Sequence, residues 1–330
     1  MICVCIGIRT SVITVGAFPK FVPCTARSMS IIVHGGAWNV PKPLREEKKK
    51  GCKIAAGVGY ECLQKGGTAI DAVERAVRSL EDNPSANAGH GSVLNENGEI
   101  EMDALIVDGK TLNFGSVASV KDIPNPISLA RMVMERTEHV FLVGKGANQF
   151  AKEMGVAVVP PEELLTEGGR QQWEEFKQYK SVVKTQFSGP SESSDTGHDT
   201  VGAVAIDNHG NLAAATSTGG ITFKKAGRVG DSPIVGSGAA CDNTLGGVST
   251  TGHGESIAKV ILAQRILNLL AQGSPGQNAV EEAILYMEGK VGGHGGAIGI
   301  TKDGELFKFY NTNNMAWASI DKDGKLDSHI

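Results

Sequence analysis

A threonine at the start of a predicted buried strand is the first candidate for chemistry. The junction reads Gly197-His198-Asp199-Thr200-Val201-Gly202-Ala203-Val204. A cut before Thr200 would give it a free α-amine, whose pKa of about 7.7 to 8.0 suits a general base at neutral pH. Thr200 would then supply both a weakly nucleophilic hydroxyl and the base that activates it. The alternative is a β-branched residue that only enters a strand.

Two further segments carry hydroxyl groups next to glycines. They read Thr216-Ser217-Thr218-Gly219-Gly220, at the end of a predicted hairpin, and Ser249-Thr250-Thr251-Gly252-His253-Gly254-Glu255, at the start of a predicted helix. A Thr-Gly pair at a helix N-terminus presents N–H donors and a favourable dipole to developing negative charge, as an oxyanion hole requires. For Thr250 and Thr251 the alternative is ordinary capping of that helix.

A glycine-rich loop between these segments holds one cation and one anion three residues apart. It reads Gly227-Arg228-Val229-Gly230-Asp231-Ser232-Pro233. Arginine binds a carboxylate through two parallel hydrogen bonds, and an aspartate accepts hydrogen bonds from an ammonium group. Arg228 and Asp231 would therefore suit the α-carboxylate and α-amine of an amino-acid-like ligand. The alternative is a surface ion pair, which would add little stability.

Several other functions find no support in the sequence. The net charge is −4, and no stripe of Lys and Arg interleaved with aromatic residues is present, so we expect no nucleic-acid partner. No apolar run reaches the roughly 18 residues of a membrane-spanning helix, so we expect no membrane partner. The histidines form no His-Glu-x-x-His motif, and no Gly-x-Gly-x-x-Gly follows the first strand. We expect no cofactor for the chemistry itself.

Hydrophobic spacing predicts a scaffold of helices and strands around these residues. Thr68 and Asp71 form a capping pattern before an amphipathic helix that runs from Ala69 to Leu80. The other predicted elements are a strand from Ile31, helices over 44–65, 128–135, 146–154, 255–271 and 279–287, strands over 92–120, 140–143 and 234–249, and hairpins over 201–216 and around 302–304. Strands in both halves with helices grouped between them indicate two stacked sheets covered by helices, an α+β fold.

Two segments differ from this pattern. Residues 1–29 contain basic residues and no acid, which is typical of a mitochondrial presequence; the alternative is a segment upstream of a working start at Met29. Residues 166–199 are rich in Glu, Lys, Gln and Ser without an apolar period, which predicts a mobile, solvated connector. The cysteines after this extension, Cys52, Cys62 and Cys241, lack disulfide or metal spacing, which favours a reduced, cytoplasmic protein.

A series of motifs, in this order from about Ile31 to the C-terminus, resembles the plant-type asparaginases, also called isoaspartyl peptidase/L-asparaginases, within the N-terminal-nucleophile hydrolases. The motifs are His34-Gly35-Gly36, Asn87-Ala88-Gly89-His90-Gly91-Ser92, Met102-Asp103-Ala104, Thr200-Val201-Gly202-Ala203-Val204, Ala215-Thr216-Ser217-Thr218-Gly219-Gly220, and the segments 227–233 and 249–255 given above. The resemblance implies a four-layer αββα sandwich, made as a precursor that cuts itself between Asp199 and Thr200. The products would be an α chain, 30–199, and a β chain, 200–330, which form one globular domain.

The resemblance also implies a role for each matching residue. Thr200 would be the nucleophile, Thr218 would orient it, and Thr251 with the Gly252 amide would stabilise the oxyanion. The substrate α-carboxylate would bind Arg228, and its α-amine would bind Asp231 and the Gly254 carbonyl. Further residues expected around the substrate are Val229, Gly230, Thr251, Gly252 and His253, with Asn87, Gly35 and Gly36 in support. Backbone carbonyls of the loop from Leu80 to Asn87 would hold a structural sodium ion, and two αβ units would form a homodimer.

The implied activity is the hydrolysis of L-asparagine and of β-aspartyl dipeptides, both small substrates with a free α-amine and α-carboxylate. One departure from the family pattern leaves the substrate class open. Asp199 stands before the nucleophile, where some members have Gly, and His198-Asp199-Thr200 resembles the glycosylasparaginase branch. The alternatives are therefore a glycosylasparaginase-type amidase and an uncut amino-acid-binding protein.

Overall fold

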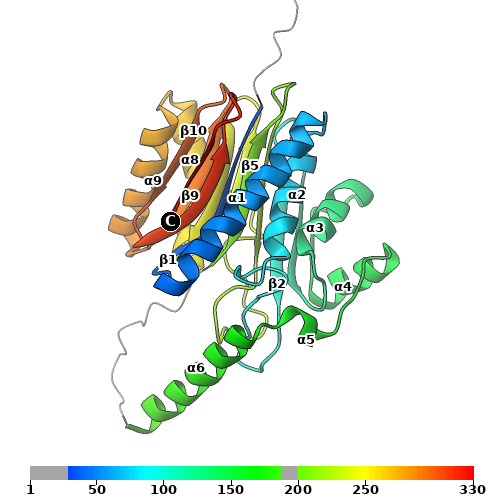
Figure 1. Ribbon diagram of the computed structural model, residues 1–330, viewed down its shortest axis with the longest axis vertical. Coiled ribbons are helices and arrows are strands. Elements are labelled where there is room, and N and C mark those ends of the chain that lie inside the picture. The colour runs from blue at the N-terminus through cyan, green and yellow to red at the C-terminus, as the bar shows by residue number, and fades with distance from the viewer. Residues whose placement is uncertain (1–28, 187–198) are drawn as a thin grey trace, which may run out of the picture.

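The computed structural model describes residues 29–186 and 199–330 (Figure 1). Within these ranges the helices are α1 (Lys42–Gln64), α2 (Ala69–Glu81), α3 (Pro126–Arg136), α4 (Gly144–Glu153), α5 (Pro161–Leu164), α6 (Glu167–Gln186), α7 (Gly254–Val260), α8 (Leu262–Ala271) and α9 (Gly276–Val291). The strands are β1 (Ser30–Trp38), β2 (Met102–Asp108), β3 (Phe114–Val120), β4 (Phe141–Val143), β5 (Val201–Ile206), β6 (Leu212–Thr218), β7 (Ala239–Asp242), β8 (Gly246–Gly252), β9 (Gly295–Thr301), β10 (Leu306–Tyr310), β11 (Asn314–Ile320) and β12 (Leu326–His329). The predicted α+β class is confirmed.

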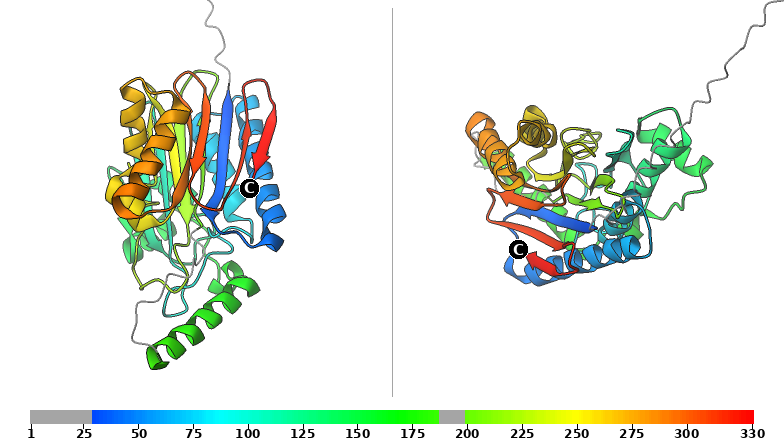
Figure 2. Two further views of the ribbon diagram at one scale, coloured as in Figure 1. Left: turned by 90° about the vertical axis from the view of Figure 1, so that its left-hand side faces the viewer. Right: turned by 90° about the horizontal axis from the view of Figure 1, so that it is seen from above.

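Two sheets stack against each other in the described part of the chain. The larger has the strand order β12-β11-β1-β5-β6-β2-β3-β4, and the smaller has the order β10-β9-β8-β7. Every neighbouring pair is antiparallel except β3 and β4. Helices α1, α2 and α3 cover the outer face of the larger sheet, and α8 and α9 cover the smaller sheet (Figure 2).

Separate groups of buried apolar residues hold these layers together. One group lies between α1–α3 and the larger sheet and includes Ile31, Val73 and Ala203. A second lies between the two sheets and includes Val204 and Ile298. A third lies between the smaller sheet and its helices. Successive residues of β5, such as Ala203 and Val204, face different groups, because successive side chains of a strand point to opposite faces.

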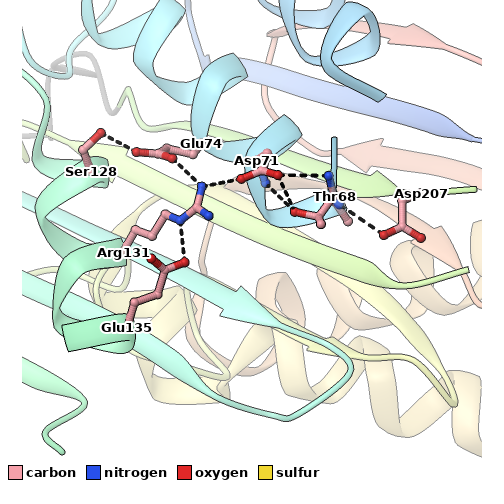
Figure 3. Close-up of polar contacts among 8 residues, drawn as sticks. Thr68, Asp71, Glu74, Ser128, Arg131, Glu135 and Asp207 are labelled. Carbon is pink, nitrogen blue, oxygen red and sulfur yellow. Dashed lines mark hydrogen bonds and ion pairs between the residues drawn. The ribbon is translucent and has the colours of Figure 1, made fainter. Parts of the chain in front are cut away.

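The start of α2 shows how local chemistry fixes one helix in this arrangement (Figure 3). Thr68 and Asp71 form the predicted capping box, in which each side chain accepts a hydrogen bond from the other residue's backbone N–H. Arg131 of α3 then forms ion pairs of 2.7 Å with Asp71, Glu74 and Glu135. This network joins α2 to α3 at the edge of their apolar contact.

Several boundaries differ from the predicted ones. The predicted connector is helical in its first part, where α6 forms; residues 187–198 lie outside the described residues, as does most of the N-terminal extension. Trp173 of α6 packs on the core and donates a hydrogen bond of 2.7 Å to the Asn95 carbonyl. That contact attaches the first half of the helix to the core. Nor is the helix predicted over 255–271 continuous, because Ile261 has φ of 50° and separates α7 from α8.

Among the described residues, no helix is long and apolar enough to cross a membrane. The three cysteines in this part of the chain, Cys52, Cys62 and Cys241, are free and buried.

Candidate active site

The junction of Asp199 and Thr200 lies in the core, at the entry to a central strand. Val201, the first residue of β5, pairs with Gly35 of β1 on one side and with Ser217 of β6 on the other. Thr200 is only 5% exposed, and so is Asp199. The chain thus passes directly from the predicted connector into a strand that is hydrogen-bonded on both sides.

Two side-chain donors hold the carbonyl oxygen of Asp199. The Thr218 hydroxyl donates to it at 3.0 Å, and the Asn87 side-chain amide donates at 3.1 Å. Asn87 is itself fixed, because its Oδ1 accepts a hydrogen bond from the Val93 backbone and its Nδ2 also donates to the Gly220 carbonyl. Hydrogen bonds of this kind polarise a carbonyl and stabilise the negative charge that nucleophilic attack would place on its oxygen.

The Thr200 hydroxyl has a different partner from the expected one. Its Oγ1 lies 3.2 Å from the Oγ of Ser232. Thr218, which the family resemblance places on Thr200, instead binds the Asp199 carbonyl in this uncut chain. Orientation of Thr200 by Thr218 stays a prediction for the cut chain.

The side chains of Arg228 and Asp231 both lie beside Gly254. An added Cβ on Gly254 would lie 2.9 Å from both side chains, so both approach that glycine. Burial raises the pKa of the Asp231 carboxyl to about 7, although Arg228 and the Thr250 hydroxyl oppose the shift. Arg228 is not free, since its guanidinium binds both carboxylate oxygens of Glu255 at 2.9 and 2.8 Å.

One pocket gathers most of the predicted residues. Its lining includes Asp199, Thr200, Thr218, Arg228, Gly230, Asp231, Ser232, Gly252 and Gly254. The free volume inside is about 10 Å³. That is room for about one water molecule, so the uncut chain has no space for an amino acid at this point.

The segment with Thr251 and Gly252 ends a strand rather than opening a helix. Helix α7 begins at Gly254 with His253 as its N-cap, so capping by Thr250 or Thr251 is wrong. The Thr251 hydroxyl is buried and has no hydrogen-bond partner within residues 29–186 and 199–330. Gly252 has φ of 132°, and an added Cβ would lie 2.3 Å from the Cα of Gly295. Only glycine fits there.

Other predicted residues lie outside the pocket lining. Val229 is 37% exposed, and the His253 ring contacts the hydroxyl of Ser256 at 2.8 Å. Gly36 has φ of 104°, and an added Cβ would overlap a carboxylate oxygen of Asp199, so this glycine makes room for the Asp199 side chain. Gly35 is packed against the sulfur of Cys52.

Lys48 of α1 is a site residue that the sequence analysis missed. It is 4% exposed, and its ammonium group binds the Asp199 carboxylate and, at 2.7 Å, the carbonyl of Ser85. Burial raises the pKa of the Asp199 carboxyl, and the Lys48 charge opposes that shift. The helical spacing of Lys48 before buried Cys52 and Ala55 was the available signal, because it places this lysine on the core face.

A buried histidine joins the two sheets behind the junction. His34 of β1 contacts the Ser249 hydroxyl of β8 through its Nε2 at 2.8 Å. Burial lowers the pKa of His34 to about 3, so the ring is neutral at physiological pH. An added Cβ on Gly202 of β5 would lie 2.4 Å from this ring, which explains a glycine there.

The loop predicted to hold sodium places carbonyl groups close together. An added Cβ on Gly91 would lie 2.4 Å from the Ala86 oxygen and 2.8 Å from the Pro84 oxygen. An added Cβ on Gly89 would lie 2.6 Å from the Glu81 oxygen. Carbonyl oxygens are hard ligands of the type that suits hard cations, so the donor chemistry fits a sodium ion. The described residues contain no cluster of three or more His, Cys, Asp or Glu side chains that could hold a metal ion.

A comparison with known protein families shows the family of this chain. A sequence model of the asparaginase family matches residues 27–330. The chain therefore belongs to the asparaginase family, whose members are hydrolases of the N-terminal-nucleophile superfamily.

Three relatives share the name isoaspartyl peptidase/L-asparaginase. The chain is 49% identical to the isoaspartyl peptidase/L-asparaginase of Xenopus laevis over 294 residues, which is 89% of this chain and 92% of the relative. It is 50% identical to the Bos taurus protein of that name, covering 91% and 95% of the two chains. It is also 50% identical to the Homo sapiens protein of that name, covering 90% and 94%.

Proposed function

We propose that this chain is an autoprocessing threonine amidohydrolase. It cuts the bond between Asp199 and Thr200, and it then hydrolyses L-asparagine and β-aspartyl dipeptides. The observation that carries this proposal is the doubly hydrogen-bonded Asp199 carbonyl directly before Thr200. The names of relatives about 50% identical to this chain support the choice of substrates.

The cut is a rearrangement followed by hydrolysis. The Thr200 oxygen attacks the carbonyl carbon of Asp199, and the hydrogen bonds from Thr218 and Asn87 stabilise the resulting oxyanion. The C–N bond then breaks, the nitrogen takes the proton of the hydroxyl, and an ester joins Asp199 to the Thr200 oxygen. Water hydrolyses this ester, which leaves a carboxylate on Asp199 and both a free amine and a free hydroxyl on Thr200.

Turnover uses the same hydroxyl again. The free amine of Thr200 accepts the hydroxyl proton while the oxygen attacks the side-chain carbonyl of asparagine or the β-linked carbonyl of a dipeptide. Thr251 and the Gly252 amide stabilise the oxyanion, and the proton passes to the departing ammonia or amino acid. Arg228 holds the α-carboxylate, and Asp231 with the Gly254 carbonyl holds the α-amine. Water then hydrolyses the β-aspartyl ester and frees Thr200.

Intact mass and N-terminal sequencing of the purified protein test the cut, with Thr200→Ala as the control. We expect a new terminus at Thr200 that the control lacks. Ammonia release from asparagine and leucine release from β-Asp-Leu, measured on the cut protein, then test the substrates. A chain that stays whole after prolonged incubation would contradict the proposal.

A glycosylasparaginase-type amidase is the second candidate, because Asp199 precedes the nucleophile. Hydrolysis of a glycosylated asparagine in parallel with β-Asp-Leu distinguishes the two activities. An uncut amino-acid-binding protein has less support, because the pocket beside Arg228 and Asp231 holds only about 10 Å³ of free space.

Three further proposals follow from the family resemblance. Sodium would bind the carbonyls of the loop from Leu80 to Asn87 and stiffen the segment that positions Asn87; no catalytic step uses it. The layers would form the αββα sandwich of N-terminal-nucleophile hydrolases, supported by the three groups of buried residues. Two αβ units would form a homodimer in the cytoplasm, unless residues 1–29 direct the protein to mitochondria.

A further inference from the structure

We propose that Lys48 binds the carboxylate of the leaving amino acid of a β-aspartyl dipeptide, and so gives the cut enzyme a preference for dipeptides over asparagine. The inference rests on the proposed function and assigns a second substrate-binding region to the same site. It uses residues of α1 and of the loop after α2.

A second cavity shares Asp199 with the pocket of Arg228 and Asp231. Its volume is about 330 Å³, and its lining includes Trp38, Leu44, Lys48, Ser85, Asn87 and Asp199. Asp199 also lines the small pocket that contains Thr200. This one residue therefore lines both spaces, and a cut before Thr200 would detach it from the chain segment that contains β5.

The buried ammonium group of Lys48 is stabilised by a negatively charged partner in this cavity. The Asp199 carboxylate and the Ser85 carbonyl are its hydrogen-bond partners in the described part of the chain, and the Trp38 ring lies 5.9 Å away. Losing one partner of a buried ion pair leaves an uncompensated charge, which is strongly unfavourable. When Asp199 moves after the cut, another carboxylate is favoured in its place.

The charges of a β-aspartyl dipeptide match the charges of the combined site. Such a dipeptide carries two carboxylates and one ammonium group, whereas asparagine carries one of each. Arg228 and Asp231 serve the aspartyl part in the pocket that Thr200 lines, and Lys48 offers a second cation in the cavity that shares Asp199 with this pocket. In the uncut chain both cations bind carboxylates of the protein itself, Glu255 and Asp199.

The cavity walls indicate which leaving residues fit. Trp38, Pro41 and Leu44 form an apolar side, and Lys48 lies at a buried position on the same helix as Leu44. A leaving residue with an apolar side chain, such as leucine, would contact this side while its carboxylate binds Lys48.

The test compares β-Asp-Leu with its C-terminal amide, which lacks only the second carboxylate. Rates are expressed per cut chain, with the cut fraction taken from intact mass. We expect the wild-type protein to favour the acid over the amide in kcat/KM. Lys48→Met lowers that ratio about 10- to 100-fold, the range for a hydrogen bond to a charged group of about 1.5 to 3 kcal/mol. Lys48→Arg retains part of the acid-to-amide ratio. Lys50→Met, at an exposed position of α1, retains the full ratio.

Lys48→Met leaves Asp199 unpaired before the cut, so the double variant Lys48→Met/Asp199→Asn provides the same measurement without a buried charge. A wild-type protein that hydrolyses acid and amide equally well overturns the role of Lys48 while the proposed function stands. An unchanged acid-to-amide ratio in the Lys48 variants also overturns the role of Lys48 and leaves the proposed function standing. Cut protein that hydrolyses none of these substrates would instead contradict the proposed function itself.

Discussion

The Thr218 hydroxyl donates a hydrogen bond of 3.0 Å to the carbonyl oxygen of Asp199, the carbonyl of the bond expected to break. Thr218→Val keeps the shape of the side chain and removes this donor. We expect the cut to slow by about 10²- to 10³-fold, the usual effect of losing one oxyanion donor. The half-time of the cut, followed by intact mass, measures this. Thr218→Ser keeps the donor and should cut at nearly the wild-type rate; equal rates for the valine and serine variants would contradict the role.

The buried Asp231 carboxyl predicts a pH dependence of substrate binding. Its pKa is raised to about 7, so below that pH it is protonated and binds an ammonium group poorly. We expect kcat/KM to rise with pH through about 7, and to rise further as the Thr200 amine loses its proton near 7.7 to 8.0. In the enzyme–substrate complex Asp231 is paired, so the profile of kcat should lack the step near 7. Identical profiles for kcat and kcat/KM would argue against Asp231 as the ammonium site.

The bidentate contact of Arg228 with Glu255 predicts competition with substrate. Glu255 has a pKa lowered to about 2; burial opposes the shift, but the hydrogen bonds and charge of Arg228 outweigh it. A substrate carboxylate bound to Arg228 as proposed would displace Glu255 or share the guanidinium with it. Partly exposed pairs contribute about 0.2 to 1 kcal/mol, so Glu255→Gln should lower KM by at most about fivefold. Steady-state kinetics on asparagine measure this. An increase in KM would mean that Glu255 orients Arg228 for the substrate instead.

The buried carboxyl of Glu81 predicts a pH dependence of stability. Burial raises its pKa to about 8, against 4.5 as its ordinary value. A raised pKa means that its stabilising contribution is full below about 4.5 and is lost as the pH rises through about 8. Glu81→Gln keeps the shape and cannot ionise. The free energy of unfolding of the wild type, relative to this variant, should therefore fall between pH 5 and pH 9 in urea titrations; a constant difference would show that Glu81 does not titrate in this range.

Much of the site could be predicted because its residues are close in sequence to recognisable turns. The loop with Arg228 and Asp231 brings its two charges together within four residues, and the structure places both beside Gly254. The hairpin of β5 and β6 likewise sets Thr218 near the start of β5, because antiparallel pairing brings the start of one strand beside the end of the next.

The contacts that could not be predicted join distant segments. Lys48 and Asp199 are 151 positions apart, and no local pattern links them. Ser232 approaches Thr200 only because its loop folds over the junction, so nothing in its own sequence distinguishes it from a turn serine. The break at Ile261 was missed for another reason: apolar spacing continues across it, although its backbone is left-handed.

The order of strands in the larger sheet has a consequence for how the mature protein can be made. A cut before Thr200 assigns β1 to one product and its two neighbours, β5 and β11, to the other. Neither product could form this sheet alone. Replacing one polypeptide by another copy would require breaking the hydrogen bonds of β1 to both β5 and β11. After such a cut, equal numbers of the two polypeptides would come from a single folding event, and each pair would derive from one precursor chain.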